Sequence, residues 1–419
     1  MTNQSNQGQV YTARSLEEAR RILLSAEKFR FKFFLYRIFI KCWVFTANLS
    51  LRILKFILFK RIGSSSRQFK NIVVYTVGIL GDNVVMLPAL AAIRRRYQNS
   101  RITVITNCQI WDQQGAIGVL GPSPFKDRLI VLDDHPVQRK GFRFVMDQNR
   151  FDGVRCDLFV NLSPFGNRGW IGAVAREMIF AKKLGAKYAV GFRMSTYTRR
   201  GLFNKVQHHF VKNEPRRSLE VLKELGLTPI KNKDLLSHDP DAKESVLRKI
   251  KEKGCNRHSL YVINPGAKYE SKCWPPERFA EVAKYVAKEY NAAIIVTGIN
   301  SEKEIGDKIV KESDGIAINL SGETTIQELV ELLRISKGCI TNDTGTMHLS
   351  AMVRIPTVAL FSGRNSPTHW LPLGENVVSA FSIIDCIYCY NDYCERPDCL
   401  TRIQVTDVLK TMGEIIDIP

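Results

Sequence analysis

The stretch that most constrains the fold of this chain is Lys337–Val353, KGCITNDTGTMHLSAMV. Its first residues are short, apolar and partly β-branched, which is typical of a buried strand. A turn at Asn342–Thr346 follows, and then apolar residues at helical spacing, with Asp343 or Thr344 as the N-cap. Free N–H groups at such a helix start, beyond the end of a parallel strand, would suit a diphosphate. An ordinary αβ turn is the alternative.

The rest of the chain also alternates strands and helices. Expected strands span residues 71–77, 102–106, 129–132, 157–162, 188–192, 259–264, 292–297, 317–320, 338–341 and 357–361. Expected helices span residues 84–97, 170–183, 216–225, 275–290, 301–311, 326–336, 347–353 and 405–416, with Pro88 near the first turn of its helix. This alternation predicts an α/β fold with two doubly wound, Rossmann-like domains, at residues 69–235 and 236–419.

A net charge of +20 points to a polyanionic partner, such as an anionic membrane, a phosphorylated substrate or nucleic acid. No helix-turn-helix, zinc-finger or aromatic RNA-binding signature supports nucleic acid. The first residues do not resemble a signal peptide, so we expect a cytoplasmic protein.

Residues 1–68 form a predicted extension that is apolar and basic together. On a helix, one narrow arc holds Arg30, Arg37, Lys41, Asn48, Arg52 and Lys55, with apolar side chains around much of the remainder. The charges recur too often for a membrane span. We therefore expect an amphipathic helix, broken near Asn48, that lies peripherally on the inner membrane with its basic face toward anionic headgroups. A helix packed on the protein's own core is the alternative.

The first strand ends in the loop Gly78-x-x-Gly81-Asp82. This loop lacks the G-x-G-x-x-G fingerprint of dinucleotide-binding proteins and the lysine of a P-loop, which disfavours nicotinamide chemistry and P-loop hydrolysis. Asp82 has two interpretations, a catalytic base or an N-cap for the following helix.

Five segments, in register from Asn71 to Thr401, resemble the lipopolysaccharide heptosyltransferases of glycosyltransferase family nine. They are GILGDNVVMLPALAAIRRRY, INPGAKYESKCWPPERF, TGINSEKE, LSGETTIQEL and TNDTGTMHLSAMVRIPTVALFSG. The resemblance implies a GT-B architecture, with two domains facing a cleft, an acceptor held mainly by the first and a nucleotide-sugar donor by the second. It also implies inverting transfer of heptose from ADP-heptose to a lipopolysaccharide core, without an obligatory metal or other cofactor.

The resemblance also implies site residues. Asp82 matches the base and Lys272 the phosphate-binding lysine, and both are expected to act in catalysis. Gly78 and Gly81 belong to the acceptor-side loop. The donor-binding positions are Glu302, Thr325, Asp343, Thr344, Gly345, Thr346 and His348. Many relatives carry Ser or Thr just before Gly78, whereas this chain has Val77, so hydroxyl donors to an acceptor carboxylate are missing there.

The C-terminal cysteines have the spacing Cys386-x2-Cys389-x4-Cys394-x4-Cys399. Four thiols could bind a structural zinc ion, although the second pair lacks the usual short spacing; disulfides or free thiols are the alternatives.

Two other functions fit a GT-B fold. One is a transferase that uses another nucleotide sugar for capsule or O-antigen assembly, and the other is a non-catalytic, membrane-bound nucleotide-sugar binder.

Overall fold

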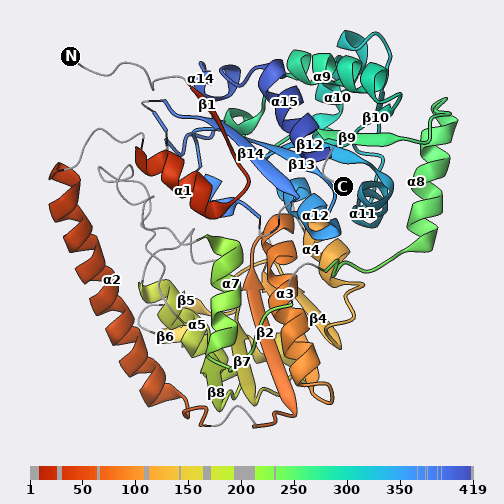
Figure 1. Ribbon diagram of the computed structural model, residues 1–419. Coiled ribbons are helices and arrows are strands. Elements are labelled where there is room, and N and C mark those ends of the chain that lie inside the picture. The colour runs from red at the N-terminus through yellow and green to blue at the C-terminus, as the bar shows by residue number, and fades with distance from the viewer. Residues whose placement is uncertain are drawn as a thin grey trace. The chain divides into compact units, whose positions relative to one another are not determined.

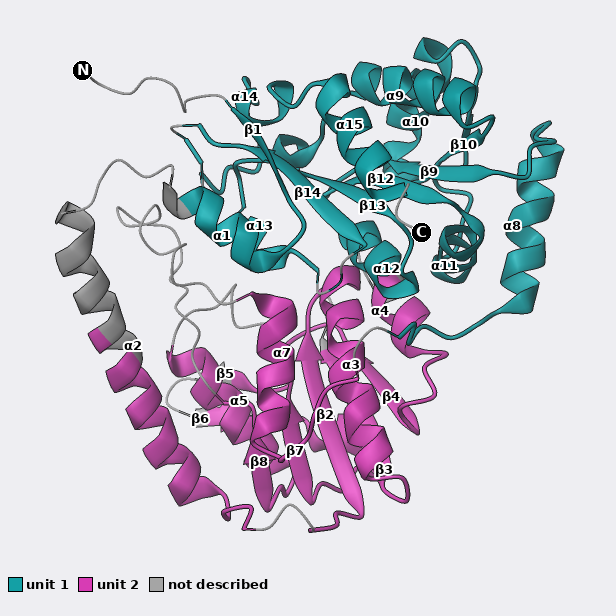
Figure 2. Ribbon diagram, viewed as in Figure 1, with its two compact units in different colours: residues 1–28, 232–419 teal, residues 29–231 magenta. Residues whose placement is uncertain are grey.

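The computed structural model describes residues 9–25, 31–63, 67–107, 113–140, 143–163, 171–192, 213–230, 233–365, 367–372, 374, 376–384, 386–387 and 389–416 (Figure 1). The chain forms two compact units (Figure 2). Unit 1 comprises residues 1–28 and 232–419, and unit 2 comprises residues 29–231. Each unit is built on its own sheet.

Unit 1 holds a seven-stranded sheet of order β1-β14-β13-β12-β9-β10-β11. The strands are β1 (Val10–Ala13), β9 (Leu260–Asn264), β10 (Ala293–Val296), β11 (Ala317–Asn319), β12 (Gly338–Asn342), β13 (Thr357–Phe361) and β14 (Val377–Ser382). All pairings are parallel except that of β1 with β14. The chain winds outward from β9 in one direction and then from β12 in the other. The strand order therefore reverses between β9 and β12, which is where open α/β sheets bind ligands.

Helices cover both faces of this sheet. On one face α9 (Pro276–Glu289), α10 (Lys303–Glu312) and α15 (Val405–Ile416) bury an apolar core with the strands. The other face is packed by α1 (Leu16–Ser25), α12 (Gly345–Val353) and α13 (Pro367–Trp370), with α11 (Ile326–Ile335) beside α12 and α8 (Pro240–Glu252) against α11. Short helices complete the unit: η4 (Glu270–Lys272), η5 (Asn300–Glu302) and α14 (Asp398–Thr401).

Unit 2 holds a five-stranded parallel sheet of order β4-β3-β2-β7-β8. Its strands are β2 (Asn71–Val77), β3 (Arg101–Asn107), β4 (Arg128–Leu132), β7 (Leu158–Asn161) and β8 (Tyr188–Val190). A hairpin of β5 (Gln138–Lys140) and β6 (Arg143–Val145) lies outside this sheet. The strand order reverses between β2 and β7, so the loop after β2 is at a switch point.

Unit 2 also carries helices on both faces of its sheet. They are α2 (Phe31–Leu58), α3 (Leu80–Arg96), α4 (Gln113–Leu120), α5 (Ile171–Lys183), α7 (Glu214–Lys223) and the short η2 (Gln148–Phe151). The face toward α2 and α5 is rich in aromatic side chains, and the rings of Tyr75 and Phe180 lie 5.2 Å apart. Two doubly wound α/β sheets were expected, and this prediction is confirmed.

Helix α3 begins four residues earlier than predicted, at Leu80 rather than Val84. The cause is Asp82, whose Oδ2 accepts a hydrogen bond of 2.8 Å from the backbone N–H of Ile79. Asp82 therefore caps from the N3 position, and its predicted position as the N-cap is wrong. With the earlier start, Pro88 lies inside the helix and not near its first turn.

The structure divides the predicted 1–68 extension between the two units. Strand β1 adds an antiparallel edge to the sheet of unit 1, and α2 packs on α5 in unit 2. Helix α2 continues through Asn48, so the predicted break there is wrong. Among the described residues, no helix is both long enough and apolar enough to cross a membrane.

Helix α2 has two apolar faces. Ala47 and Leu51 are buried in the core of unit 2, and Lys55, from the predicted basic arc, forms an ion pair of 2.6 Å with Glu224. The opposite face is exposed and apolar, with fractional exposures of 68% for Phe45, 47% for Leu49, 55% for Ile53, 79% for Phe56 and 71% for Ile57. The buried face confirms the interpretation of a helix packed on the protein's own core, whereas the placement of this helix on a membrane stays a prediction.

The two faces of α2 predict different responses to truncation. Leu51→Ala should lower the free energy of unfolding by about 2–5 kcal/mol, because it removes a fully buried side chain. Ile57→Ala should change it by less than about 0.5 kcal/mol, because Ile57 is exposed. Urea unfolding followed by circular dichroism measures both, and equal losses would contradict the assigned orientation of the helix.

Candidate active site

A buried ion pair lies at the switch point of the unit 1 sheet. Lys272 ends η4, in the connection after β9, and Asp343 directly follows β12. The Lys272 Nζ lies 2.7 Å from Asp343 Oδ2, with side-chain exposures of 11% and 6%. Burial alone would raise the pKa of Asp343, but the Lys272 ammonium and a hydrogen bond from Asn365 lower it below its usual value. Asp343 is therefore ionised at neutral pH, and a fixed cation faces it.

The N-terminus of α12 adjoins this pair. Thr344 is the N-cap, and Gly345 and Thr346 are the first helical residues. The Thr344 hydroxyl is 3.2 Å from Asn264 Oδ1 and accepts no hydrogen bond from the helix it caps. The first N–H groups of this helix thus lack a side-chain acceptor from Thr344, and an anion could take that place.

Two asparagines also lie beside the ion pair and the start of α12, and neither was predicted as a site residue. Asn264 ends β9 and donates to the carbonyl of Thr297 at 2.9 Å. Asn365, after β13, donates to Asp343 Oδ2 at 3.1 Å. Asn264 had a signal in the sequence, because it is a polar residue at the end of an apolar strand, a position that converges with others at the same sheet edge. Asn365 lies four residues beyond β13 and had no such signal.

His348 lies one turn into α12 and is 5% exposed. Burial lowers its pKa to about 4, with the Lys272 charge acting in the same direction and Asp343 opposing it. Its Nδ1 has no hydrogen-bond partner in the part of the chain that the structure describes. The imidazole is therefore neutral at pH 7 and contributes no charge to the site.

Glu302 lies beside the same edge, after β10. Its Oε2 accepts a hydrogen bond of 2.9 Å from the Ile299 N–H. A Cβ atom on Gly266 would lie 2.0 Å from the Glu302 carboxyl carbon, and one on Gly298 would lie 2.7 Å from Oε2. Burial raises the pKa of Glu302, and the Ile299 hydrogen bond opposes this shift. The two glycines thus give the carboxylate room at the ends of β9 and β10.

Asp82 occupies the corresponding switch point of unit 2. It is 9% exposed and lies in the first turn of α3, beside the buried Gly81. Gly78 has a φ of +147°, and a Cβ there would lie 2.1 Å from Asp82 Oδ2. Glycine at position 78 is therefore required for the carboxylate to cap the helix.

Thr325 has a clear structural role. It is the N-cap of α11, its hydroxyl accepting from the Glu328 N–H at 3.1 Å while Glu328 Oε2 accepts from the Thr325 N–H at 2.7 Å. This reciprocal capping box accounts for the residue. Its predicted contact with a nucleotide stays a prediction.

The C-terminal cysteines, Cys386, Cys389, Cys394 and Cys399, are free thiols. Burial, reinforced by the neighbouring thiols, raises the pKa of Cys399 to about 11. Within the described ranges, no group of three or more His, Cys, Asp or Glu side chains is arranged to hold a metal ion.

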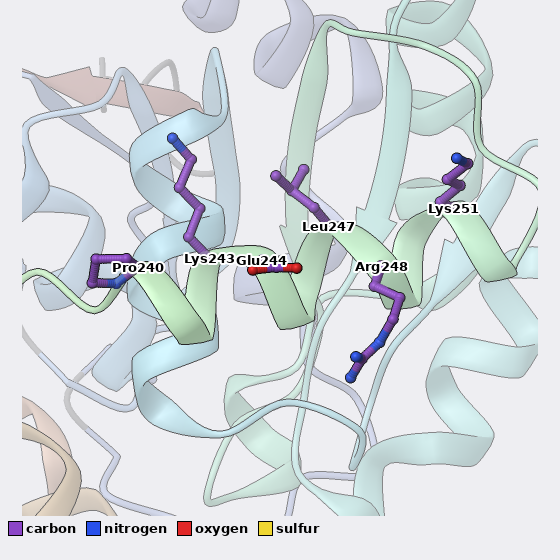
Figure 3. A pocket seen from close by; sticks show the side chains of 6 residues that line it. All are labelled: Pro240, Lys243, Glu244, Leu247, Arg248 and Lys251. Carbon is purple, nitrogen blue, oxygen red and sulfur yellow. The ribbon is translucent and has the colours of Figure 1, made fainter.

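A shallow hollow of about 470 Å³ lies along one side of α8 (Figure 3). All of its lining residues belong to that helix: Pro240, Lys243, Glu244, Leu247, Arg248 and Lys251. Their side chains spread along the helix without converging on one point, so the candidate site is assigned to the strand ends and not to this hollow.

The neutral state of His348 has a consequence for acid stability. Below pH 6.5 the unfolded chain takes up a proton at this imidazole, whereas the folded protein does not until about pH 4. Stability should fall over this interval, by up to about 1.4 kcal/mol per pH unit from this residue. His348→Gln should lose less stability than the wild type between pH 7 and pH 5 in urea titrations, and parallel losses would contradict the assignment.

Comparison with known proteins identifies similar sequences. The family model of glycosyltransferase family 9 (heptosyltransferase) matches residues 179–398. Lipooligosaccharide heptosyltransferase 2 of Campylobacter jejuni is 31% identical over 225 residues, which cover 51% of this chain and 69% of that protein. Lipopolysaccharide heptosyltransferase 2 of Salmonella typhimurium is 35% identical over 116 residues, 26% of this chain and 33% of that protein. The aligned part therefore spans about a third of the latter relative.

Solved structures share the fold. A family 9 glycosyltransferase from Veillonella parvula superposes with a TM-score of 0.61 at 22% identity, covering 84% of this chain and 99% of that one. The E. coli ADP-heptose lipopolysaccharide heptosyltransferase II gives a TM-score of 0.58 at 18% identity, covering 83% and 98%. The match of the family model over more than half of the chain shows that this protein belongs to glycosyltransferase family 9.

Proposed function

We propose that the protein is an inverting glycosyltransferase that moves a heptose from ADP-heptose to a lipopolysaccharide core or a related lipid-linked acceptor. The observation that carries this proposal is the Lys272–Asp343 pair beside the N-terminus of α12, because it joins a fixed cation to backbone donors at the switch point of a sheet. The relatives named lipopolysaccharide and lipooligosaccharide heptosyltransferases support the donor and acceptor classes.

The proposed transfer is a single displacement. The acceptor hydroxyl oxygen attacks the anomeric carbon of the heptose, the bond from that carbon to the phosphate oxygen breaks, and ADP leaves with the electron pair. Charge that develops on the diphosphate is stabilised by Lys272 and by the N–H groups at Gly345 and Thr346. Asp343 would keep Lys272 directed into the site before the donor binds.

Glu302 would accept hydrogen bonds from the ribose hydroxyls of the donor. Its Oε2 is held by the Ile299 N–H, and the carboxylate lies over Gly266 and Gly298 at the sheet edge that also carries Lys272. A carboxylate in this position after a strand is a common ribose ligand in nucleotide-binding sheets. Thr325 is proposed as a weaker contact on the same side.

Asp82 would accept the proton of the attacking hydroxyl. With Oδ2 fixed by the Ile79 N–H, the carboxylate has a defined orientation at the switch point of unit 2. A helix N-terminus favours the ionised form, and an ionised aspartate is a weak base. Proton removal should therefore be late and coupled to formation of the new bond.

We also propose that transfer needs no resident metal ion. Lys272 already provides the positive charge that a divalent cation would otherwise supply to a departing diphosphate.

A different nucleotide sugar for capsule or O-antigen assembly remains the alternative donor, since neither Lys272 nor Thr344 distinguishes one base or sugar from another.

The proposed place of action is the cytoplasmic face of the inner membrane, where a lipid-linked acceptor lies. The exposed apolar face of α2, formed by Phe45, Leu49, Ile53, Phe56 and Ile57, supports this proposal, as does the net charge of +20. A helix with such a face can lie in the headgroup region, and each nearby Lys or Arg adds about 1 kcal/mol of attraction to anionic lipid.

The base assignment predicts the effect of Asp82→Asn. The amide oxygen can still accept from the Ile79 N–H, so the fold and ADP affinity should be kept, whereas turnover should fall by about 10²–10⁴-fold. The measurement is ADP release from ADP-heptose with heptose-deficient lipopolysaccharide. Asp157→Asn is a matched control, because Asp157 accepts from the Asn71 N–H at 2.9 Å, at the start of β2, at the other edge of the sheet.

Three outcomes of that assay separate the alternatives. Full activity of Asp82→Asn would remove Asp82 as the base. Binding of ADP-heptose without turnover in the wild type would indicate a different acceptor or a non-catalytic binder. If ADP-heptose does not bind, the proposed donor is another nucleotide sugar.

The membrane proposal predicts that Ile53→Asn/Phe56→Asn weakens binding to vesicles containing phosphatidylglycerol by at least about tenfold, because two large apolar side chains no longer leave water. Sedimentation with such vesicles measures it. Leu247→Asn, which alters a 41%-exposed leucine on α8, should bind as the wild type does. Equal binding by all three proteins, or DNA binding at physiological salt without vesicle binding, would contradict the proposal.

A further inference from the structure

Arg364 lies in the loop after β13, outside the predicted site, and its side chain makes several polar and aromatic contacts. Its side chain is 11% exposed. The guanidinium carbon lies 3.8 Å from the ring centre of Tyr269, and Nη2 contacts Asp392 Oδ1 at 2.5 Å. Its Nε donates to the carbonyl of Asn391 at 2.9 Å. Arg364 therefore joins the loop after β13 to the segment between Cys389 and Cys394.

That segment also holds the residue next to Lys272. The Ser271 hydroxyl donates to the Asn391 carbonyl at 2.6 Å, and the Ser271 N–H donates to the Asp392 carbonyl at 3.3 Å. Ser271 is 4% exposed, so the donor side of both contacts is buried, whereas Asn391 and Asp392 are exposed residues. Asn391 thus receives hydrogen bonds from both Arg364 and Ser271.

A second route leads from Arg364 to the same lysine. Arg364 Nη1 donates to Asn365 Oδ1 at 3.2 Å, and Asn365 Nδ2 donates to Asp343 Oδ2, the atom that also faces Lys272 Nζ. These contacts, with the covalent link from Ser271 to Lys272, therefore form a closed ring that includes Lys272. Its members are Arg364, Asn391, Ser271, Lys272, Asp343 and Asn365.

We propose that Arg364 is a positioning residue for Lys272, a role that rests on the proposed binding of a diphosphate at this lysine. Arg364 holds residues 391–392 against Ser271 and holds Asn365 against Asp343. Both ends of the lysine, its backbone through Ser271 and its ammonium through Asp343, are thereby fixed before the donor binds. Residues 391–392, between Cys389 and Cys394, thereby support Lys272.

The chemistry of arginine fits this role. A planar guanidinium can donate from three nitrogens to three acceptors at fixed angles while its face stacks on an aromatic ring, whereas a lysine ammonium cannot do both. Arg364→Lys should therefore keep the charge and lose the ring of contacts. Arg257→Lys is the matched control, because Arg257 also donates to two backbone carbonyls, those of Ala287 and Ala292, but precedes β9 at the other edge of the same sheet.

The first test needs no nucleotide. Hydrogen–deuterium exchange should show faster exchange of the Ser271–Cys273 amides in Arg364→Lys than in the wild type, because the contact from Ser271 to Asp392 is released. Arg257→Lys should leave this segment unchanged. Unchanged exchange in Arg364→Lys, or equally faster exchange in both variants, would overturn the proposal.

The second test is ADP affinity, measured by calorimetry. Arg364→Lys should weaken ADP binding by about tenfold in the wild-type background and by less than about twofold in Lys272→Met/Asp343→Asn, where the positioned groups are gone. An effect that persists in the second background would mean that Arg364 contacts the nucleotide itself, and would overturn a positioning role. If the wild type does not bind ADP, the proposed function fails, while the exchange experiment still decides the role of Arg364.

Discussion

The proposed donor site depends on one interaction, the buried ion pair between Lys272 and Asp343. An unpaired charge at this depth would be costly, and removing one partner of such a pair typically costs about 3–5 kcal/mol. Asp343 also accepts a hydrogen bond from Asn365, and its neighbour Thr344 is the N-cap of α12. The pair therefore fixes the connection after β9 relative to the ends of β12 and β13. A donor diphosphate would meet a cation that is already oriented, so little reorganisation would accompany the departure of ADP.

The same short sequence motif orients a carboxylate in each unit. Gly78 and Gly298 each begin the sequence Gly-Ile-x-x-acidic at the end of a parallel strand, with Asp82 and Glu302 as the acidic residues. Each carboxylate accepts from the isoleucine N–H, at 2.8 and 2.9 Å, in the space that a glycine leaves open. One of these carboxylates is the proposed base and the other the proposed ribose ligand. Local backbone geometry thus orients both before any ligand binds.

Elements that depend on local sequence patterns could be predicted from the sequence. Apolar runs such as Asn71–Val77 and Thr357–Phe361 have the predicted bounds, because buried parallel strands leave little ambiguity. Strand β1 was missed, since an edge strand has no continuous apolar run and pairs with β14 far away in the chain. Contacts of Arg364 and Asn365 could not be predicted either, because they join loops after different strands. The early start of α3 could have been found from Asp82 as an N3 residue, since the backward capping bond is local.

The most direct measurement is the affinity of ADP relative to adenosine, in the wild type and in Lys272→Met/Asp343→Asn. The double variant removes both charges together and so leaves neither buried alone. If the ion pair holds the diphosphate, the wild type should bind ADP at least about a hundredfold more tightly than adenosine, which corresponds to about 2.7 kcal/mol from the diphosphate. This preference should largely disappear in the double variant, while adenosine affinity stays the same. An equal preference for ADP in both proteins would contradict the assignment of the ion pair to the diphosphate.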